Sequence, residues 1–319
     1  MGRQVRNSSQ TRWRAMPDGA SALTTDPADA EALIGASTRV VRDDFAGPGG
    51  WSTGIADLLA DEGLTEVALE WDASACQTRI ANGHTRTLRA DVAAYPIEPF
   101  LGRTLIYIAS PPCQTFSMAG LGDGRQHTAH LAQAAYDILT SRITYEEALA
   151  ELAPTGALND SHGQPDPRTG LVLIPARVIR QLLDYDGRGL TDLEAVALEQ
   201  VPTVGPIYEA YALGLRALGW CAITSKLNAA DYGVPQTRER VFMLASRART
   251  VTIPEPSHAR GGEAESLFGP GRLPWVSMAR AFDLPVLSPH QAYVKMGSRP
   301  HAARRNLTSD PASTIRGNP

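Results

Sequence analysis

LIYIASPPCQ, residues 105–114, predicts the fold class of this chain. Its first five residues form a short, continuous apolar run, as expected of a strand that is buried in a parallel sheet. Two prolines then end the run, because proline has no backbone N–H for the strand ladder. Cys113 follows at the carboxyl end of the strand, where open α/β sheets bind their ligands. A thiol at that place is a candidate nucleophile.

Strand and helix patterns alternate over residues 38–250, which is typical of a doubly wound, Rossmann-like α/β sheet. Strands are predicted from Val40 and over 66–70, 105–109, 195–198, 221–226 and 241–245, and helices over 53–61, 74–82, 130–140, 145–152, 171–183 and 207–218. Residues 1–37 are polar and lack clear periodicity, so they are predicted to form a mobile N-terminal arm or a short helix. Residues 121–165 form an insertion, and residues 251–319 form a small, irregular C-terminal region.

The composition is that of a soluble globular protein. Of the 319 residues, 43% are hydrophobic and 20% are charged, and no apolar run approaches the roughly 18 residues of a membrane span. The first residues lack the apolar core of a signal peptide. Three cysteines make a disulfide framework improbable and favour a reducing cytoplasm. The net charge of −4 does not favour strong nucleic-acid binding, and the basic residues near both ends are equally well read as solvated termini.

A glycine turn, FAGPGG (residues 45–50), follows the first predicted strand. Glycines at such a turn let the backbone approach a ligand closely, and the next helix begins with N–H groups that favour anions. Ser52 stands where a dinucleotide fingerprint has glycine, and Pro48 removes an N–H that a pyrophosphate would use. The turn therefore favours a ligand without a diphosphate.

Acidic residues follow the next two predicted strands. Glu70 is placed to accept hydrogen bonds from ribose hydroxyls, Trp71 to stack on adenine, and Asp91 to accept a hydrogen bond from an exocyclic amine. Each acid alone is better explained as an exposed loop residue. Together with the glycine turn, they favour a nucleoside cofactor such as S-adenosylmethionine.

A second group of polar residues gathers at two other strands. Glu199 directly follows the predicted strand over 195–198, and burial would raise its pKa toward the range of a general acid. Alternation places Gln236, Arg238 and Arg240 on one face, where the two arginines would fix a carboxylate or bind an oxygen of a substrate. By itself, this cluster is better explained as an edge strand with a salt bridge.

In this order, the motifs resemble those of the bacterial DNA (cytosine-5)-methyltransferase family over residues 38–248. They are FAGPGG (45–50), EW (70–71), Asp91, PPCQ (111–114), RTGL (168–171), EQV (199–201) and QTRER (236–240). The resemblance implies that residues 38–250 are the catalytic domain of an enzyme that uses S-adenosylmethionine. It also implies a bacterial or phage-encoded cytoplasmic protein that associates with the nucleoid, acts on double-stranded DNA and belongs to a restriction-modification system.

The resemblance further implies a mechanism and a set of site residues. A cytosine is flipped out of the duplex, Cys113 attacks its C6, Glu199 acts at N3, Arg240 holds O2 and Arg238 orients Glu199. The residues it implies for DNA contacts are Gln114, Ser117 and Gln236, and no metal is expected. The residues it implies for cofactor contacts are Phe45, Gly47, Pro48, Gly49, Gly50, Glu70, Trp71, Asp91, Val92, Pro112 and Leu171.

The chain departs from the family pattern at three places. Gln200 stands where the family has asparagine, and the stretch from Cys113 to Arg168 is longer than in compact relatives. The last residues, 314–319, resemble the segment before the family's two closing motifs, so residues 251–319 are expected to be a partial target recognition region. Three explanations stay open: the polypeptide is shortened, a second chain supplies the missing motifs, or the remaining pocket suffices. The alternatives are a non-catalytic remnant that binds DNA or a partner, one half of a split methyltransferase, and an enzyme for cytosine in tRNA or another nucleic acid.

Overall fold

The structure is a computed structural model that describes residues 23–112, 124–159, 164, 166, 168–184, 192–265, 271–284, 293–295 and 304–313. The chain divides into two compact units, Met1–Leu101 and Gly102–Pro319, and each is described by itself. Within the described ranges, no helix is both long and apolar enough to cross a membrane.

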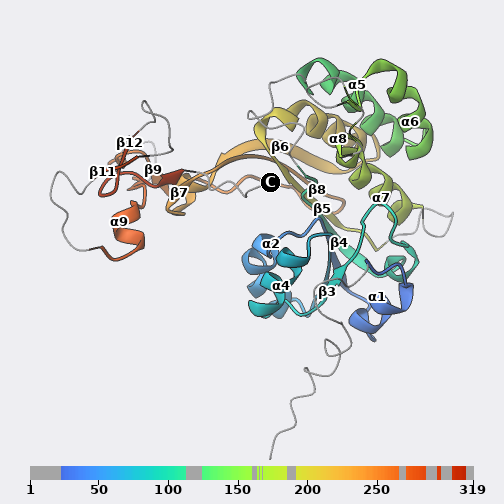
Figure 1. Cartoon of the computed structure of the whole chain (residues 1–319), viewed down its shortest axis with the longest axis horizontal. Helices are drawn as coiled ribbons and strands as arrows, with labels where there is room; N and C mark the ends of the chain where they lie inside the picture. The colour runs from blue at the N-terminus through green and yellow to red at the C-terminus, as the bar shows by residue number, and fades with distance from the viewer. Residues whose placement is uncertain are drawn as a thin grey trace, which may run out of the picture. The chain divides into compact units, whose positions relative to one another are not determined.

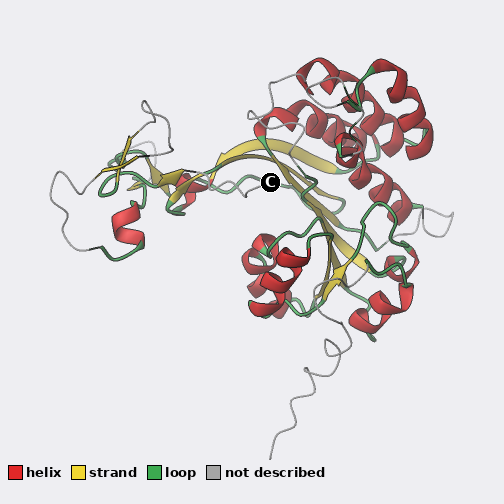
Figure 2. Ribbon diagram, viewed as in Figure 1, coloured by secondary structure: helices red, strands yellow, loops and turns green. Residues whose placement is uncertain are grey.

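A seven-stranded sheet is the main element of the fold (Figure 2). Its strand order is β3-β2-β1-β4-β5-β8-β6. The pairs β1–β2, β2–β3 and β4–β5 are parallel, whereas β8 runs antiparallel to both β5 and β6. The predicted doubly wound α/β class is therefore confirmed. The strands are β1 (Val40–Asp44), β2 (Thr65–Glu70), β3 (Thr87–Arg89), β4 (Thr104–Ala109), β5 (Ala195–Gln200), β6 (Cys221–Asn228) and β8 (Glu239–Ser246).

The first unit contains strands β1–β3, with α2 and α4 on one side and α1 on the other (Figure 1). Every residue of β1 is buried, as expected of a strand covered on both faces. Helix α1 begins after Asp26, whose carboxylate accepts the Ala28 N–H, and a proline occupies its first turn. The predicted helix over 53–61 is two helices that meet at Ile55, directly after Gly54. The helices are α1 (Pro27–Ile34), α2 (Gly50–Gly54), α3 (Ala56–Asp61), α4 (Ala73–Ala81) and the 3-10 helix η3 (Glu98–Phe100).

The second unit contains strands β4, β5, β6 and β8 and a group of packed helices. Helix α5 packs against α6, α7 and α8, and α8 also lies against β6 and β8. A capping box of Thr144 and Glu147 begins α6, which follows the predicted bounds. The helices are α5 (Gly124–Leu139), α6 (Tyr145–Leu152), α7 (Ile174–Leu183), α8 (Gly205–Ala217) and the 3-10 helices η4 (Ala153–Thr155), η5 (Thr169–Leu173), η6 (Pro202–Val204) and η7 (Ala229–Tyr232).

Short elements form the C-terminal part of this unit. Residue Ala312 pairs with Gln236, and Trp275 donates its indole N–H to Asp231 at 2.9 Å. Strands β9 and β10 pair in parallel, and β11 and β12 pair antiparallel. The elements are β7 (Gln236–Thr237), β9 (His258–Ala259), β10 (Leu273–Pro274), α9 (Met278–Ala281), β11 (Tyr293–Lys295), β12 (Arg304–Asn306) and β13 (Ala312–Ser313).

Candidate active site

The glycine turn joins β1 to α2 in a tightly constrained backbone. Phe45, Gly47 and Gly49 have φ angles of 57°, 53° and 105°, all in the left-handed region. That region favours glycine, and it is uncommon for a bulky residue such as Phe45. A Cβ on Gly49 would lie 2.8 Å from Cδ2 of His84. Glycine is therefore required at position 49 by both conformation and space.

Glu70 lies at the carboxyl end of β2 and connects to this turn. Its Oε2 accepts the Gly47 N–H at 2.7 Å, and its Oε1 accepts the Asp72 N–H at 2.7 Å. Each carboxylate oxygen has a further lone pair, so the group can still accept hydrogen bonds from a ligand. The first predicted cofactor acid is thus held at a fixed place beside the turn.

The other predicted cofactor residues of the first unit lie after β2 and β3. Trp71 is 58% exposed, which is unusual for so large an apolar side chain and leaves its ring free to stack. Asp91 is half-buried and accepts the Ala93 N–H at 2.9 Å, while Val92 is buried. Because β1, β2 and β3 are adjacent and parallel, their carboxyl ends bring the turn, Glu70 and Asp91 to one edge of the sheet.

Glu199 forms the centre of a charged cluster in the second unit. Its Oε1 lies 2.9 Å from Nε of Arg240 and 3.6 Å from Nη2 of Arg238. The side chains of Glu199 and Arg240 are 17% and 15% exposed, whereas that of Arg238 is 40% exposed. Burial raises the pKa of Glu199, although Arg240 and Arg238 act in the opposite direction. A carboxyl with a raised pKa is suited to hold a proton for catalysis.

The register between β4 and β5 connects this cluster to the Pro-Pro turn. Ala109 pairs with Leu198, so Ser110 and Glu199 are the next residues of the two parallel strands. The Ser110 side chain forms a hydrogen bond with the Glu199 carboxyl. Gln200 is buried, and its amide donates to the Pro111 carbonyl while accepting the Val201 N–H at 2.5 Å. Glu199 is therefore tied to the backbone that leads to Cys113.

The remaining predicted residues are less closely grouped. Cys113, Gln114 and Ser117 lie outside the described residues. Half-buried positions are occupied by Pro112 after β4, Leu171 in η5 and Gln236 in β7. Of the described side chains, no three or more of His, Cys, Asp and Glu are grouped so as to hold a metal ion.

Two polar residues near these clusters were missed by sequence reasoning. Arg79 is fully buried behind the glycine turn, and Ser110 contacts Glu199. The spacing of Arg79 from Cys76 could have predicted its burial, because residues three apart share a helix face and Cys76 is also buried. Ser110 had a signal too, since it directly precedes the Pro-Pro pair at a strand end.

The sheet, with its glycine turn after β1 and acids after β2 and β3, defines the class of Rossmann-like methyltransferases. The sequence model of the family described as C-5 cytosine-specific DNA methylase matches residues 41–142 and 206–265, just over half of the chain. This protein belongs to that family of DNA methyltransferases, as the sequence motifs predicted.

Individual proteins similar to this chain are also named as methyltransferases. Type II methyltransferase M.AquIA of Picosynechococcus sp. is 28% identical over 274 residues, which cover 78% of this chain and 90% of M.AquIA. Type II methyltransferase M.SacI of Streptomyces achromogenes is 24% identical over 260 residues, covering 74% of this chain and 55% of M.SacI. The Dnmt2 methyltransferase of S. pombe superposes with a TM-score of 0.44 at 16% identity, over 67% of this chain and 53% of that one. A superposition that weak adds nothing to the family assignment.

Proposed function

We propose that this protein transfers a methyl group from S-adenosylmethionine to C5 of a cytosine in double-stranded DNA, through a covalent adduct with Cys113. The observation that carries the proposal is the Glu199 cluster. A half-buried carboxyl with a raised pKa is held by Arg240 and by Ser110, three residues before Cys113. A nucleophile and a proton donor at adjacent strand ends are the groups that cytosine activation requires.

The residues of the first unit fit S-adenosylmethionine. A glycine turn with Pro48 in place of an N–H donor suits a nucleoside without a diphosphate. Glu70 keeps free lone pairs for the ribose hydroxyls, and the exposed Trp71 ring offers a face to adenine. When bound, S-adenosylmethionine supplies an electrophilic methyl group on a positively charged sulfur. The further contacts proposed on sequence grounds are Phe45, Gly47, Gly49, Gly50, Asp91, Val92, Pro112 and Leu171.

The chain's own residues account for the activation of cytosine. The base must leave the stack, because its ring faces are covered in the duplex. The Cys113 thiolate then forms a bond to C6, and the displaced electron pair moves toward N3, where Glu199 donates a proton or hydrogen bond. Arg240 binds O2, and Arg238 orients Glu199. C5 then bonds the methyl group, whose bond to sulfur breaks with both electrons staying on the sulfur. A solvent base takes the C5 proton, N3 returns its proton to Glu199, the C5–C6 double bond re-forms and the thiolate leaves C6.

DNA recognition is proposed to involve both the Cys113 turn and the C-terminal part. Gln114, Ser117 and Gln236 would contact DNA, and residues 251–319 would act as a partial target recognition region. In support, Gln236 pairs with Ala312, so the QTRER motif (236–240) is joined to the end of that region. The predicted assignment of residues 38–250 as the catalytic domain and a cytoplasmic, nucleoid-associated location belong to the same proposal.

Transfer of a labelled methyl group tests the proposed function. The protein is incubated with labelled S-adenosylmethionine and either genomic duplex DNA from an unrelated host or bulk tRNA. We expect label in DNA at C5 of cytosine and none in tRNA. Label in tRNA alone would favour the RNA-directed alternative. Cofactor and DNA binding without transfer would favour the non-catalytic alternative.

A further inference from the structure

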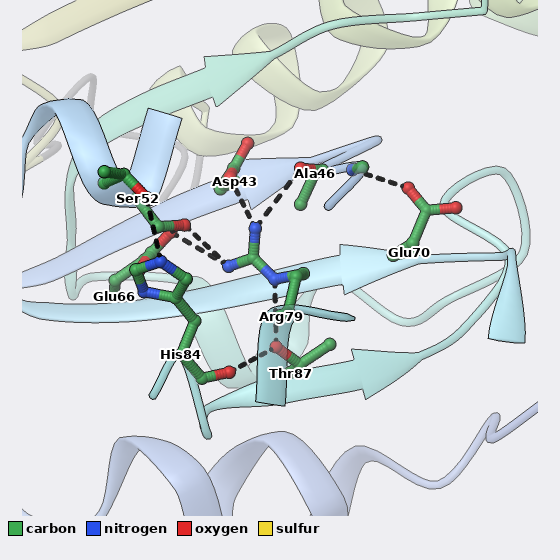
Figure 3. A network of polar contacts seen from close by, with 10 residues as sticks. Asp43, Ala46, Ser52, Glu66, Glu70, Arg79, His84 and Thr87 are labelled. Carbon is green, nitrogen blue, oxygen red and sulfur yellow. Dashed lines mark hydrogen bonds and ion pairs between the residues drawn. The ribbon is translucent and has the colours of Figure 1, made fainter. Parts of the chain in front are cut away.

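Arg79 of α4 is fully buried, and its guanidinium connects five separate segments of the first unit (Figure 3). Toward the glycine turn, Nη1 donates to the Ala46 carbonyl at 3.2 Å and Nη2 donates to Ser52 Oγ at 2.8 Å. Toward the sheet, Nε donates to Thr87 Oγ1 at 3.0 Å and Nη2 to Glu66 Oε1 at 3.2 Å, while Asp43 lies 3.6 Å from Nη1. We call Arg79 and these partners the Arg79 network.

Arg79 contacts the glycine turn and the helix after it. It bonds to the backbone carbonyl of Ala46 within the turn and to the side-chain Oγ of Ser52, two residues after Gly50, so one rigid group holds both segments. The turn contains three residues with left-handed φ angles, which are sparsely populated conformations for an L-residue such as Phe45. Such a backbone conformation persists only where surrounding contacts hold it in place, and the Arg79 guanidinium provides such contacts.

Ser52 and His84 complete the support beneath the turn. Ser52 is buried, donates to Glu66 Oε1 at 2.5 Å and accepts from Arg79, so α2 is tied to the start of β2. His84 contacts Thr53 Oγ1 at 3.1 Å through Nε2, and its ring leaves no room for a Cβ on Gly49. The position that carries glycine in a dinucleotide fingerprint therefore carries a hydroxyl that fixes the turn to Arg79.

A buried arginine here is expected to add little to the free energy of unfolding, but it fixes the positions of the groups around it. A buried ion pair loses its hydration, and replacing it with apolar residues is often neutral or stabilising. The planar guanidinium, however, directs its donors along fixed lines, so it selects one arrangement of the groups around it. Glu66 lies 3.2 Å from Nη2 of Arg79 and balances its charge in the buried interior.

The fixed turn also determines the place of Glu70, because Gly47 donates its N–H to that carboxylate at 2.7 Å. We propose that Arg79 is a positioning residue of the cofactor site: it holds the glycine turn, and through it Glu70, in the form that binds S-adenosylmethionine. This inference rests on the proposed function, since it takes that site as the cofactor site. Arg79 itself touches no cofactor atom in this account.

Arg42 provides a matched control for the experiment. It is as deeply buried in the same unit, lies 2.9 Å from Asp44 and stacks over Phe100 at 4.5 Å, yet its described contacts include no residue of the glycine turn. Arg79→Lys and Arg42→Lys each keep a charge and lose the planar fork. Calorimetry measures the Kd of S-adenosylmethionine for each, and thermal melting measures their stability.

We expect both variants to melt at a lower temperature. Arg79→Lys should raise the cofactor Kd about tenfold or more, a change of about 1.4 kcal/mol, while Arg42→Lys stays within about twofold of the wild type. With saturating cofactor, kcat and the KM for DNA of Arg79→Lys should return to wild-type values. An unchanged Kd in Arg79→Lys, or an equal loss in both variants, overturns the positioning role. A wild type that does not bind S-adenosylmethionine refutes the proposed function instead.

Smaller substitutions test the same role if Arg79→Lys does not fold. Ser52→Ala removes a contact on the turn side of the network, whereas Tyr95→Phe removes a buried hydroxyl of the same unit that donates to the Asp26 carbonyl at 2.8 Å and lies outside the network. A positioning role predicts a weaker cofactor affinity in Ser52→Ala and an unchanged affinity in Tyr95→Phe, although both lose stability. Equal cofactor affinities in the two variants would show that the network only stabilises the fold.

Discussion

The two units use arginine–carboxylate pairs in different ways. In the first, Arg79 is fully buried and every nitrogen of its guanidinium meets a protein oxygen. In the second, Arg238 is 40% exposed and lies 3.6 Å from Glu199, while the less exposed Arg240 lies at 2.9 Å. The first arginine is enclosed by groups of the protein, whereas the other two lie at a carboxyl whose pKa is raised by burial.

Arg79 holds a backbone turn in place, whereas Arg238 and Arg240 change the pKa of Glu199. A guanidinium that bonds to several segments inside the protein can fix a turn. Arginines at a half-buried carboxyl act against the burial that raises its pKa.

The largest effect is expected at Glu199. Glu199→Gln keeps the shape of the side chain but cannot donate a carboxyl proton to N3, so kcat should fall by about 10²–10⁴-fold. The Kd of S-adenosylmethionine should stay unchanged. Glu239→Gln is the matched control, because Glu239 is exposed on the adjacent strand and pairs with Lys226 at 3.2 Å. Similar turnover in the two variants would remove Glu199 from the mechanism.

A smaller effect is expected at Glu70. Glu70→Ala removes the acceptor of the ribose hydroxyls, and hydrogen bonds to a charged group are worth about 1.5–3 kcal/mol, which is about ten- to a hundredfold in affinity. Calorimetry with S-adenosylmethionine measures the loss. Glu62→Ala removes the same charge from an exposed ion pair with Arg39 and should bind the cofactor normally. Normal binding by Glu70→Ala would contradict the cofactor assignment.

Arg238→Gln tests the tuning of Glu199. Arg238 lowers the pKa that burial raises, so the variant should have a Glu199 pKa higher than that of the wild type. Because the protonated carboxyl is the active form, the alkaline limb of the kcat profile should move to higher pH. At neutral pH, turnover should change by less than about fivefold, since exposed ion pairs are worth about 0.2–1 kcal/mol. A limb that moves to lower pH would contradict this role.

Asp43→Asn should have the smallest effect, and it concerns stability. Burial raises the pKa of Asp43 well above that of an ordinary aspartate, despite Arg79 nearby. A raised folded-state pKa gives stability that is fully present below about pH 3.9 and is lost as the pH rises through the folded pKa. The variant should therefore match the wild type in strongly acidic buffer and gain on the order of 1 kcal/mol, or about 2–4 °C in Tm, at alkaline pH. A lower Tm at alkaline pH would show that the charged Asp43 is stabilising.

The strand ends were predictable from the sequence because they depend on local signals. The apolar run before the Pro-Pro pair and the glycine turn after Val40 both mark where a strand must stop. Glu199 is a partial exception: it lies inside β5, which extends to Gln200, whereas the predicted strand ended at Leu198. The first polar residue after an apolar run does not show where the strand ends, because backbone pairing can continue through polar residues.

The Arg79 network could not be predicted, since it depends on contacts between segments that are distant in the sequence. An arginine in a short helix is usually exposed, and only packing shows that α4 turns this one toward the sheet. The same is true of Gln200, whose amide reaches the Pro111 carbonyl 89 residues earlier in the chain. Helix α5 begins at Gly124, earlier than the predicted residue 130, because its first turn lacks an apolar pattern.

The covalent adduct is the most direct test of the central claim that Cys113 activates a cytosine of DNA. The protein is incubated with S-adenosylmethionine and duplex DNA in which 5-fluorocytosine replaces cytosine throughout, and denaturation-resistant complexes are mapped to a peptide. Fluorine blocks the loss of the C5 proton, so the account predicts a stable adduct at Cys113 that Cys113→Ser abolishes while cofactor binding persists. No adduct with the wild type, or an adduct that survives in Cys113→Ser, would contradict it.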